Sequence, residues 1–174
     1  MIVYYSRTGN TKSLAEFLKD QLSAEIQEIK TNIEEKGKIN FIRAGWQAVK
    51  KFCPELSPIR VDLGRYDLVL IGTPVWALTM ASPIRSFLKT YHSKLPAVGF
   101  FATMGKVGSE STFAHMADLV GKKPLACLAV SEQAIKSGSF QPKAKEFVIS
   151  VRTYLEKKMC HNILLGDNSK QGKI

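Results

Sequence analysis

The distribution of apolar residues along the chain most constrains its fold. Short apolar runs, such as Leu68–Ile71 and Ala97–Thr103, alternate with segments like Ser82–Tyr91, in which apolar residues recur every three or four positions. The runs predict strands buried on both faces, and the periodic segments predict amphipathic helices. Such alternation favours a doubly wound α/β fold, in which helices cover both faces of a parallel sheet. With 174 residues, the chain is too short for a (β/α)8 barrel, which needs about 250 residues.

We expect one domain over residues 1–158 and a polar tail over residues 159–174. Residues 30–64 form an extended connection, in which Phe41–Phe52 has the apolar spacing of an extra helix. The predicted strands are Ile2–Tyr5, Glu25–Ile29, Leu68–Ile71, Ala97–Thr103 and Leu125–Val130. The predicted helices of the main fold are Thr11–Ser23, Ser82–Tyr91, Ser111–Val120 and Pro142–Leu155.

The chain is strongly basic, with 25 Lys and Arg against 15 Asp and Glu, which gives a net charge of +10. Such a surplus suggests a polyanion or an acidic surface as partner. The basic residues are spread over the predicted helices and the tail and do not gather with aromatic residues, so nucleic acid is the weaker interpretation. An acidic protein partner or an anionic substrate fits better.

Several classes of protein are disfavoured by what the sequence lacks. Its longest apolar runs are too short to span a bilayer, so we expect no stable membrane anchor. The first residues lack a signal-peptide pattern, which favours the cytoplasm. The cysteines Cys53, Cys127 and Cys160 are scattered, and neither a metal site nor a nucleophile with a nearby base is apparent.

The loop after the first predicted strand carries the clearest functional signal. It reads Ser6-Arg7-Thr8-Gly9-Asn10-Thr11 and opens the first predicted helix. Its hydroxyl groups and the Asn10 amide can donate to phosphate oxygens, while Gly9 lets the backbone curl around an anion at the helix N-terminus. Taken alone, such a cluster is more often only a capped helix with a glycine turn. Their density after an N-terminal strand favours a monophosphate site.

This loop resembles the [ST]-x-T-G-x-T phosphate loop of the flavodoxin family. Two further segments, Thr73-Pro74-Val75-Trp76 and Thr103-Met104-Gly105-Lys106-Val107-Gly108, resemble the loops that flank the flavin ring in that family, and all three occur in the family's order. The resemblance implies a five-stranded parallel sheet of order 2-1-3-4-5 that binds FMN. It implies that Ser6–Thr11 hold the phosphate, with Arg7 and Lys12 adding charge, and that Trp76, expected in a loop, stacks on the ring. Gly105 and Gly108 would present backbone N–H groups to the ring.

The sequence departs from the usual electron carriers of this family at two points. Flavodoxins usually place a second aromatic residue in the last of these loops, where this chain has Met104 and Val107. They are also typically acidic. We expect an FMN-binding electron-transfer protein with a redox partner. An FMN-dependent NAD(P)H:quinone-type oxidoreductase is the first alternative, and a flavin-free module that binds partners is the second. In the first two cases the flavin carries the chemistry, and we expect no catalytic side chain.

Overall fold

The computed structural model describes residues 1–31, 53–57 and 61–164, so the predicted helix Phe41–Phe52 lies outside the described residues. Its central sheet has five parallel strands in the order β2-β1-β3-β5-β6. The strands are β1 (Ile2–Tyr4), β2 (Ile26–Glu28), β3 (Leu68–Trp76), β5 (Ala97–Met104) and β6 (Cys127–Ser131). The short strand β4 (Thr79–Met80) pairs antiparallel with β3. Counting only parallel strands, the predicted order 2-1-3-4-5 is confirmed.

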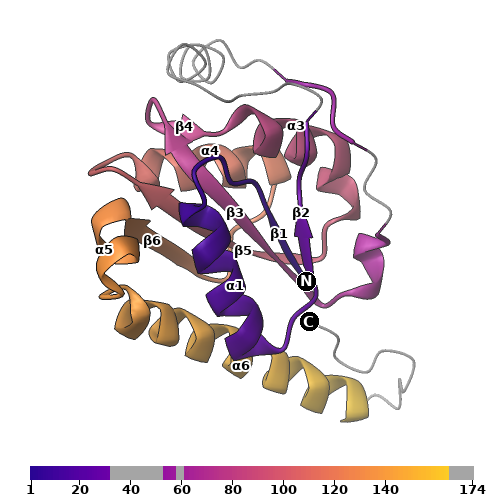
Figure 1. Ribbon diagram of the computed structural model, residues 1–174. Coiled ribbons are helices and arrows are strands. Elements are labelled where there is room, and N and C mark those ends of the chain that lie inside the picture. The colour runs from indigo at the N-terminus through magenta and orange to yellow at the C-terminus, as the bar shows by residue number, and fades with distance from the viewer. Residues whose placement is uncertain (32–52, 58–60, 165–174) are drawn as a thin grey trace.

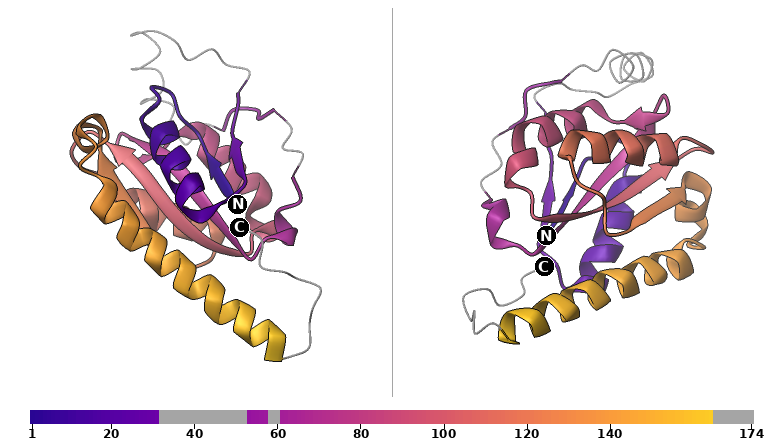
Figure 2. Two further views of the ribbon diagram at one scale, coloured as in Figure 1. Left: turned by 60° about the horizontal axis from the view of Figure 1, so that its bottom comes forward. Right: turned by 180° about the vertical axis from the view of Figure 1, so that it is seen from behind.

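Helices cover both faces of this sheet (Figures 1 and 2). One face carries α1 (Asn10–Leu22), α6 (Gln141–Leu164) and the short α5 (Glu132–Ser137). The other face carries α3 (Ser82–Tyr91) and α4 (Ser109–Val120). Single 3-10 turns, Leu63–Arg65 and His92–Lys94, precede β3 and β5. The doubly wound arrangement is thus the one that the alternating sequence pattern predicts.

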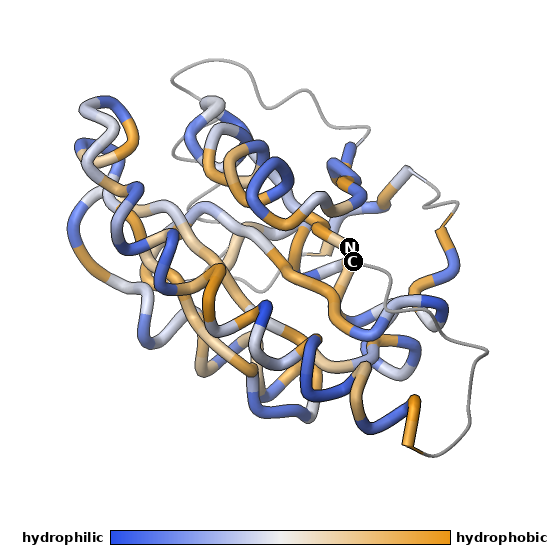
Figure 3. Tube along the Cα trace, turned by 90° about the horizontal axis from the view of Figure 1, so that it is seen from below, coloured by the Kyte–Doolittle hydropathy of each residue, from blue (hydrophilic) through white to orange (hydrophobic). Residues whose placement is uncertain are grey.

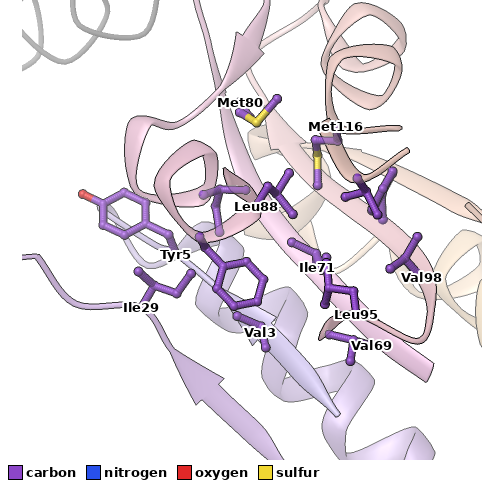
Figure 4. Close-up of a cluster of buried hydrophobic side chains, with 14 of the residues drawn as sticks. Val3, Tyr5, Ile29, Val69, Ile71, Met80, Leu88, Leu95, Val98 and Met116 are labelled. Atoms are coloured by element: carbon purple, nitrogen blue, oxygen red, sulfur yellow. The ribbon is translucent and has the colours of Figure 1, made fainter. Parts of the chain in front are cut away.

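Side chains from alternate positions of each strand build two separate cores. Val3, Val69 and Ile71 point to the α3 and α4 side, where Met80 and Met116 complete the packing (Figure 4). The neighbouring residues Ile2, Leu68 and Leu70 point to the α1 and α6 side. In Figure 3 the strands are mainly hydrophobic, whereas hydrophobic and hydrophilic residues alternate along the helices. Burial on both faces explains why the central strands read as unbroken apolar runs.

Strand β3 is longer than the predicted run Leu68–Ile71 because it continues through Gly72 to Trp76. Gly72 allows this continuation, since a Cβ atom there would lie 2.1 Å from Cζ of Phe101 on β5. The ring of Phe101 is fully buried and occupies the space that a side chain would need. The extension carries β3 beyond the end of its neighbour β1, toward the loops that the sequence predicts to be functional.

Helix α6 is also longer than predicted, because it ends at Leu164 and not at Leu155. It therefore passes residue 159, where the predicted tail begins. Its buried residues, Ala144, Phe147, Val148 and Val151, all lie in its first half. The second half is tied to the domain by an ion pair of 2.8 Å between Lys158 Nζ and the buried Asp67 carboxylate.

Candidate functional site

The loops that follow β1, β3, β5 and β6 all leave the same edge of the sheet (Figure 1). This is the edge formed by the carboxyl ends of the parallel strands, where open α/β sheets bind ligands. The chain enters α1 on one side of the sheet and α3 and α4 on the other, so the edge lies between helices of both layers. The three segments that the sequence singles out meet there.

The loop Ser6–Gly9 joins β1 to α1 and leaves the start of the helix open. Gly9 is the residue before the helix, with a φ of 93° that favours glycine, and no side chain caps the helix. A Cβ atom at Gly9 would have no neighbour within 4 Å, so the space above the loop is open. The hydroxyl of Ser6 is buried and has no hydrogen-bond partner among the described residues. These are donors of the kind that a phosphate group would use.

The side chains of Asn10 and Thr11 both form hydrogen bonds to other elements of the fold. Asn10 Nδ2 donates to Glu132 Oε1 at 2.7 Å, which links the start of α1 to α5. The Thr11 hydroxyl lies 2.7 Å from that of Thr103 and is buried, which links α1 to the end of β5. Glu132 could not be identified from the sequence because 122 positions separate it from Asn10 and no local pattern marks it. Both side chains therefore help to hold the start of α1 in place against α5 and β5.

The second segment forms a β-hairpin, and not the loop predicted from sequence. Trp76 and Thr79 are paired across β3 and β4, so Ala77 and Leu78 make the turn. Both turn residues have positive φ angles, 47° and 62°, which are unusual for residues other than glycine. The turn is held from α4, because Ser111 Oγ donates to the Leu78 carbonyl at 2.6 Å. The Ala81 N–H donates to Thr73 Oγ1 at 3.0 Å and closes the hairpin base.

Trp76 lies at the end of β3 and is 9% exposed, in the core on the α3 and α4 side. The edge of one ring meets the face of the other between Trp76 and Tyr5, with centroids 5.7 Å apart. The guanidinium carbon of Arg7 lies 5.9 Å from the indole centroid. Arg7 thus connects the phosphate loop to the hairpin. Stacking of Trp76 on a flavin stays a prediction. The large hydrophobic side chain that the hairpin exposes is that of Leu78, at 55%.

The third segment runs from the end of β5 into α4 and contacts the hairpin. Thr103 is buried and Met104 half-buried, whereas Gly105, Lys106 and Val107 are exposed. Gly108 has a φ of 106°, and a Cβ atom there would lie 2.9 Å from Val75 Cγ1. This close approach brings the last loop against the β3–β4 hairpin.

The same loop also faces α5 on its other side. Gly105 and Lys106 border an open hollow of about 600 Å³ that α5 completes with Glu132, Gln133, Lys136 and Ser137. The three predicted segments are therefore contiguous at one edge of the sheet, with Pro74 and Val75 half-buried between them.

The edge offers donors that would fit the phosphate group and ring of FMN. An uncapped helix start, an unpartnered buried hydroxyl at Ser6 and the exposed Thr8 suit a phosphate group. Backbone at Gly105 is unobstructed, since a Cβ atom there would have no neighbour within 4 Å.

Groups of three or more potential metal-binding side chains are absent from the described residues. Cys53, Cys127 and Cys160 are exposed, and none of them forms a disulfide within the described residues. Across residues 1–31, 53–57 and 61–164, no helix combines the length and apolar character needed to cross a bilayer.

Comparisons with known proteins agree with this geometry. The chain resembles a flavoprotein from Lactobacillus acidophilus solved in complex with FMN, with 24% identity, a TM-score of 0.66, and coverage of 79% of this chain and 96% of the other. It also resembles a Fusobacterium nucleatum flavodoxin bound to FMN, with 9% identity, a TM-score of 0.56, and coverage of 88% and 96%. A WrbA-like protein from Agrobacterium tumefaciens has 15% identity, a TM-score of 0.51, and coverage of 87% and 96%.

At these identities the solved structures show a shared fold. None of the curated proteins matches the chain. A family model described as flavodoxin matches residues 1–127, which include all three segments of the site. The chain therefore belongs to the flavodoxin family.

Proposed function

We propose that this protein binds FMN at the carboxyl edge of its sheet and transfers electrons through it. The observation that supports this most directly is the open start of α1, where Gly9 turns the backbone and the buried Ser6 hydroxyl has no partner among the described residues. FMN supplies the one- and two-electron chemistry when bound. The chain's own residues bind and orient it and shield it from water.

In this proposal the phosphate lies against Ser6, Thr8 and the first N–H groups of α1. The helix dipole and the cations Arg7 and Lys12 favour its negative charge. Asn10 and Thr11 hold the loop in shape through Glu132 and Thr103. The segments Thr73–Trp76 and Thr103–Gly108 flank the ring. These two segments contact each other at Val75 and Gly108.

The test is a calorimetric titration of the apoprotein with FMN and with riboflavin, which lacks the phosphate. Ser6→Ala removes a hydrogen bond to a charged group, so we expect FMN to bind about 10-fold more weakly or worse. Riboflavin affinity should not change. Ser150→Ala is the matched control, because Ser150 is exposed on α6 and bonds only within its helix. Equal losses for both ligands would contradict the placement of the phosphate, and no binding of FMN would support the flavin-free alternative.

An FMN-dependent reductase is the second candidate, supported by the residues of the last loop. Neither Met104 nor Val107 is aromatic, and Val107 is 69% exposed, so neither residue would cover a face of the ring as an aromatic side chain does. A face of the ring left open in this way could accept hydride from NAD(P)H or pass it to a quinone. Steady-state oxidation of NADPH and NADH with a soluble quinone distinguishes the two proposals. Negligible turnover, with stepwise one-electron reduction in the visible spectrum, favours the carrier.

We further propose an acidic redox partner in the cytoplasm. The support is the net charge of +10, which would speed encounter with an acidic surface. The rate of electron exchange with such a partner should then fall steeply as salt is added, because exposed charges are screened. A rate independent of ionic strength would contradict this proposal.

A further inference from the structure

The first turn of α3 contains two buried polar side chains whose hydrogen-bonding groups are not all used. Ser82 is fully buried and Arg85 is 5% exposed. The Ser82 hydroxyl and the Nε–H group of Arg85 have no hydrogen-bond partner among the described residues. Residues three apart lie on the same side of a helix, so these two donors face a common region. Buried donors are normally satisfied, and leaving one unsatisfied costs about 1–3 kcal/mol.

Arg85 is also a buried positive charge that no carboxylate of the described residues balances. The ion pairs in the described part of the chain involve Lys12, Arg65 and Lys158. Burial lowers the pKa of Arg85, and the Cys53 thiol nearby only partly opposes this effect. A charge removed from water needs a counter-charge or several hydrogen bonds to be stable. Arg85 has one such bond in the described structure, from Nη2 to Thr79 Oγ1 at 2.9 Å.

The helix itself adds to the positive potential at this point. α3 begins at Ser82, with Pro83 in its first turn, and Ala81 before it provides no side-chain cap. The N–H groups of a first helical turn carry a partial positive charge and have no partners within the helix. The guanidinium, the hydroxyl and the helix start therefore all favour a negatively charged oxygen.

A row of polar groups connects this region to the molecular surface. Thr79 Oγ1 accepts from Arg85, so its own proton is available to His115 Nδ1, which lies 3.3 Å away on α4. His115 is exposed, whereas Thr79 and Arg85 are buried. Because Thr79 pairs with Trp76 in the β3–β4 hairpin, this row runs directly beside the hairpin. A molecule at the hairpin could therefore place one charged end at the start of α3.

We propose that Ser82, Arg85 and the first turn of α3 form an oxyanion subsite. Its ligand is a carboxylate or phosphate group of a small molecule that lies beside the hairpin. Such a group would engage the two donors that have no partner among the described residues, and its charge would balance Arg85. The subsite is separate from the start of α1, and it does not depend on FMN.

The test is nuclear magnetic resonance of the arginine Nε–H groups during titration with sodium acetate or inorganic phosphate. The Arg85 signal is identified by its loss in Arg85→Lys. We expect it to shift and saturate, while the signal of the exposed Arg152 stays in place. The titration uses protein saturated with FMN, so that added phosphate cannot bind at the start of α1. If FMN does not bind, the apoprotein is titrated with acetate instead. Saturation by acetate alone indicates carboxylate ligands, and saturation by phosphate alone indicates phosphorylated ones.

Substitutions give a second measure of the same site. Arg85→Met should weaken anion binding at least 10-fold and Ser82→Ala about threefold, with Arg152→Met as the matched control. If Arg85→Met does not fold, Ser82→Ala and the wild-type spectra still decide the question. An Arg85 signal that does not move overturns the proposal and indicates that water satisfies these donors. A shift of equal size at Arg152 also overturns it, because it would report ionic strength alone.

Discussion

Replacing Gly108 by alanine should destabilise the protein by an amount that the structure allows us to estimate. The φ of 106° at this position costs a residue with a Cβ atom about 1–2 kcal/mol. The new methyl group would also lie 2.9 Å from Val75 Cγ1 and 3.1 Å from the backbone Cα of Leu78. Displacing the hairpin to relieve these contacts is overpacking, which costs about 1–3 kcal/mol. We therefore expect a loss of about 2–5 kcal/mol in the free energy of unfolding.

Two other glycines separate these contributions. Gly121 has a positive φ of 67°, but a methyl group added there would have no neighbour within 4 Å, so Gly121→Ala should cost only about 1–2 kcal/mol. Gly105 lies in the same loop as Gly108 with neither constraint, so Gly105→Ala should change stability by less than about 1 kcal/mol. Urea unfolding of the three apoproteins, monitored by circular dichroism, gives the comparison. If Gly108→Ala is as stable as Gly105→Ala, the contact between this loop and the hairpin is not as described.

Three further predictions concern charged and titrating groups. Lys158→Met should lower the free energy of unfolding, measured in urea, by about 1–3 kcal/mol, because it leaves the buried Asp67 carboxylate without its partner. Adding Asp67→Asn to this variant should recover part of the loss. Burial, and then the charges of Glu28 and Glu16, raise the pKa of Tyr4 to about 12. The stability that Tyr4 contributes should be fully present below about pH 10 and fall by roughly 2 kcal/mol as the pH rises to 12, and Tyr4→Phe should remove this effect from an alkaline unfolding series. Lys106→Glu should lower the one-electron potentials of bound FMN in a redox titration, by roughly 40 mV for each ~1 kcal/mol of charge interaction lost, and unchanged potentials would contradict a role for Lys106.

The sheet and its main helices could be predicted because their signals are local. The apolar run Leu68–Ile71 and the periodic segment Ser82–Tyr91 each report burial within a few residues, and both are found as expected. The β3–β4 hairpin could not be predicted, because its turn residues Ala77 and Leu78 lack the glycine or asparagine that usually marks such a turn. The turn is instead stabilised by Ser111, which is distant in sequence.

The meeting of the three segments at one edge of the sheet was predictable, whereas the contacts of their side chains were less so. The order of the three segments brings them to one edge of the sheet, whatever their side chains do. The contacts of Asn10 with Glu132 and of Thr11 with Thr103 depend on how α1 packs across β5 and α5, which no local pattern encodes. The burial of Trp76 could not be predicted either, because it accompanies the extension of β3 past Gly72.

The unequal anchoring of α6 has a consequence for how the native protein fluctuates. Ala144, Phe147, Val148 and Val151 are buried in the core. Residues 152–164 rely instead on the pair Lys158–Asp67, on a hydrogen bond from Arg152 to the Gln21 carbonyl, and on the partly buried Tyr154 and Leu155. The last three turns should therefore open and close without unfolding the domain. In native-state hydrogen exchange, amides after Arg152 should exchange through this local opening, and those around Phe147 should exchange only when the whole domain unfolds.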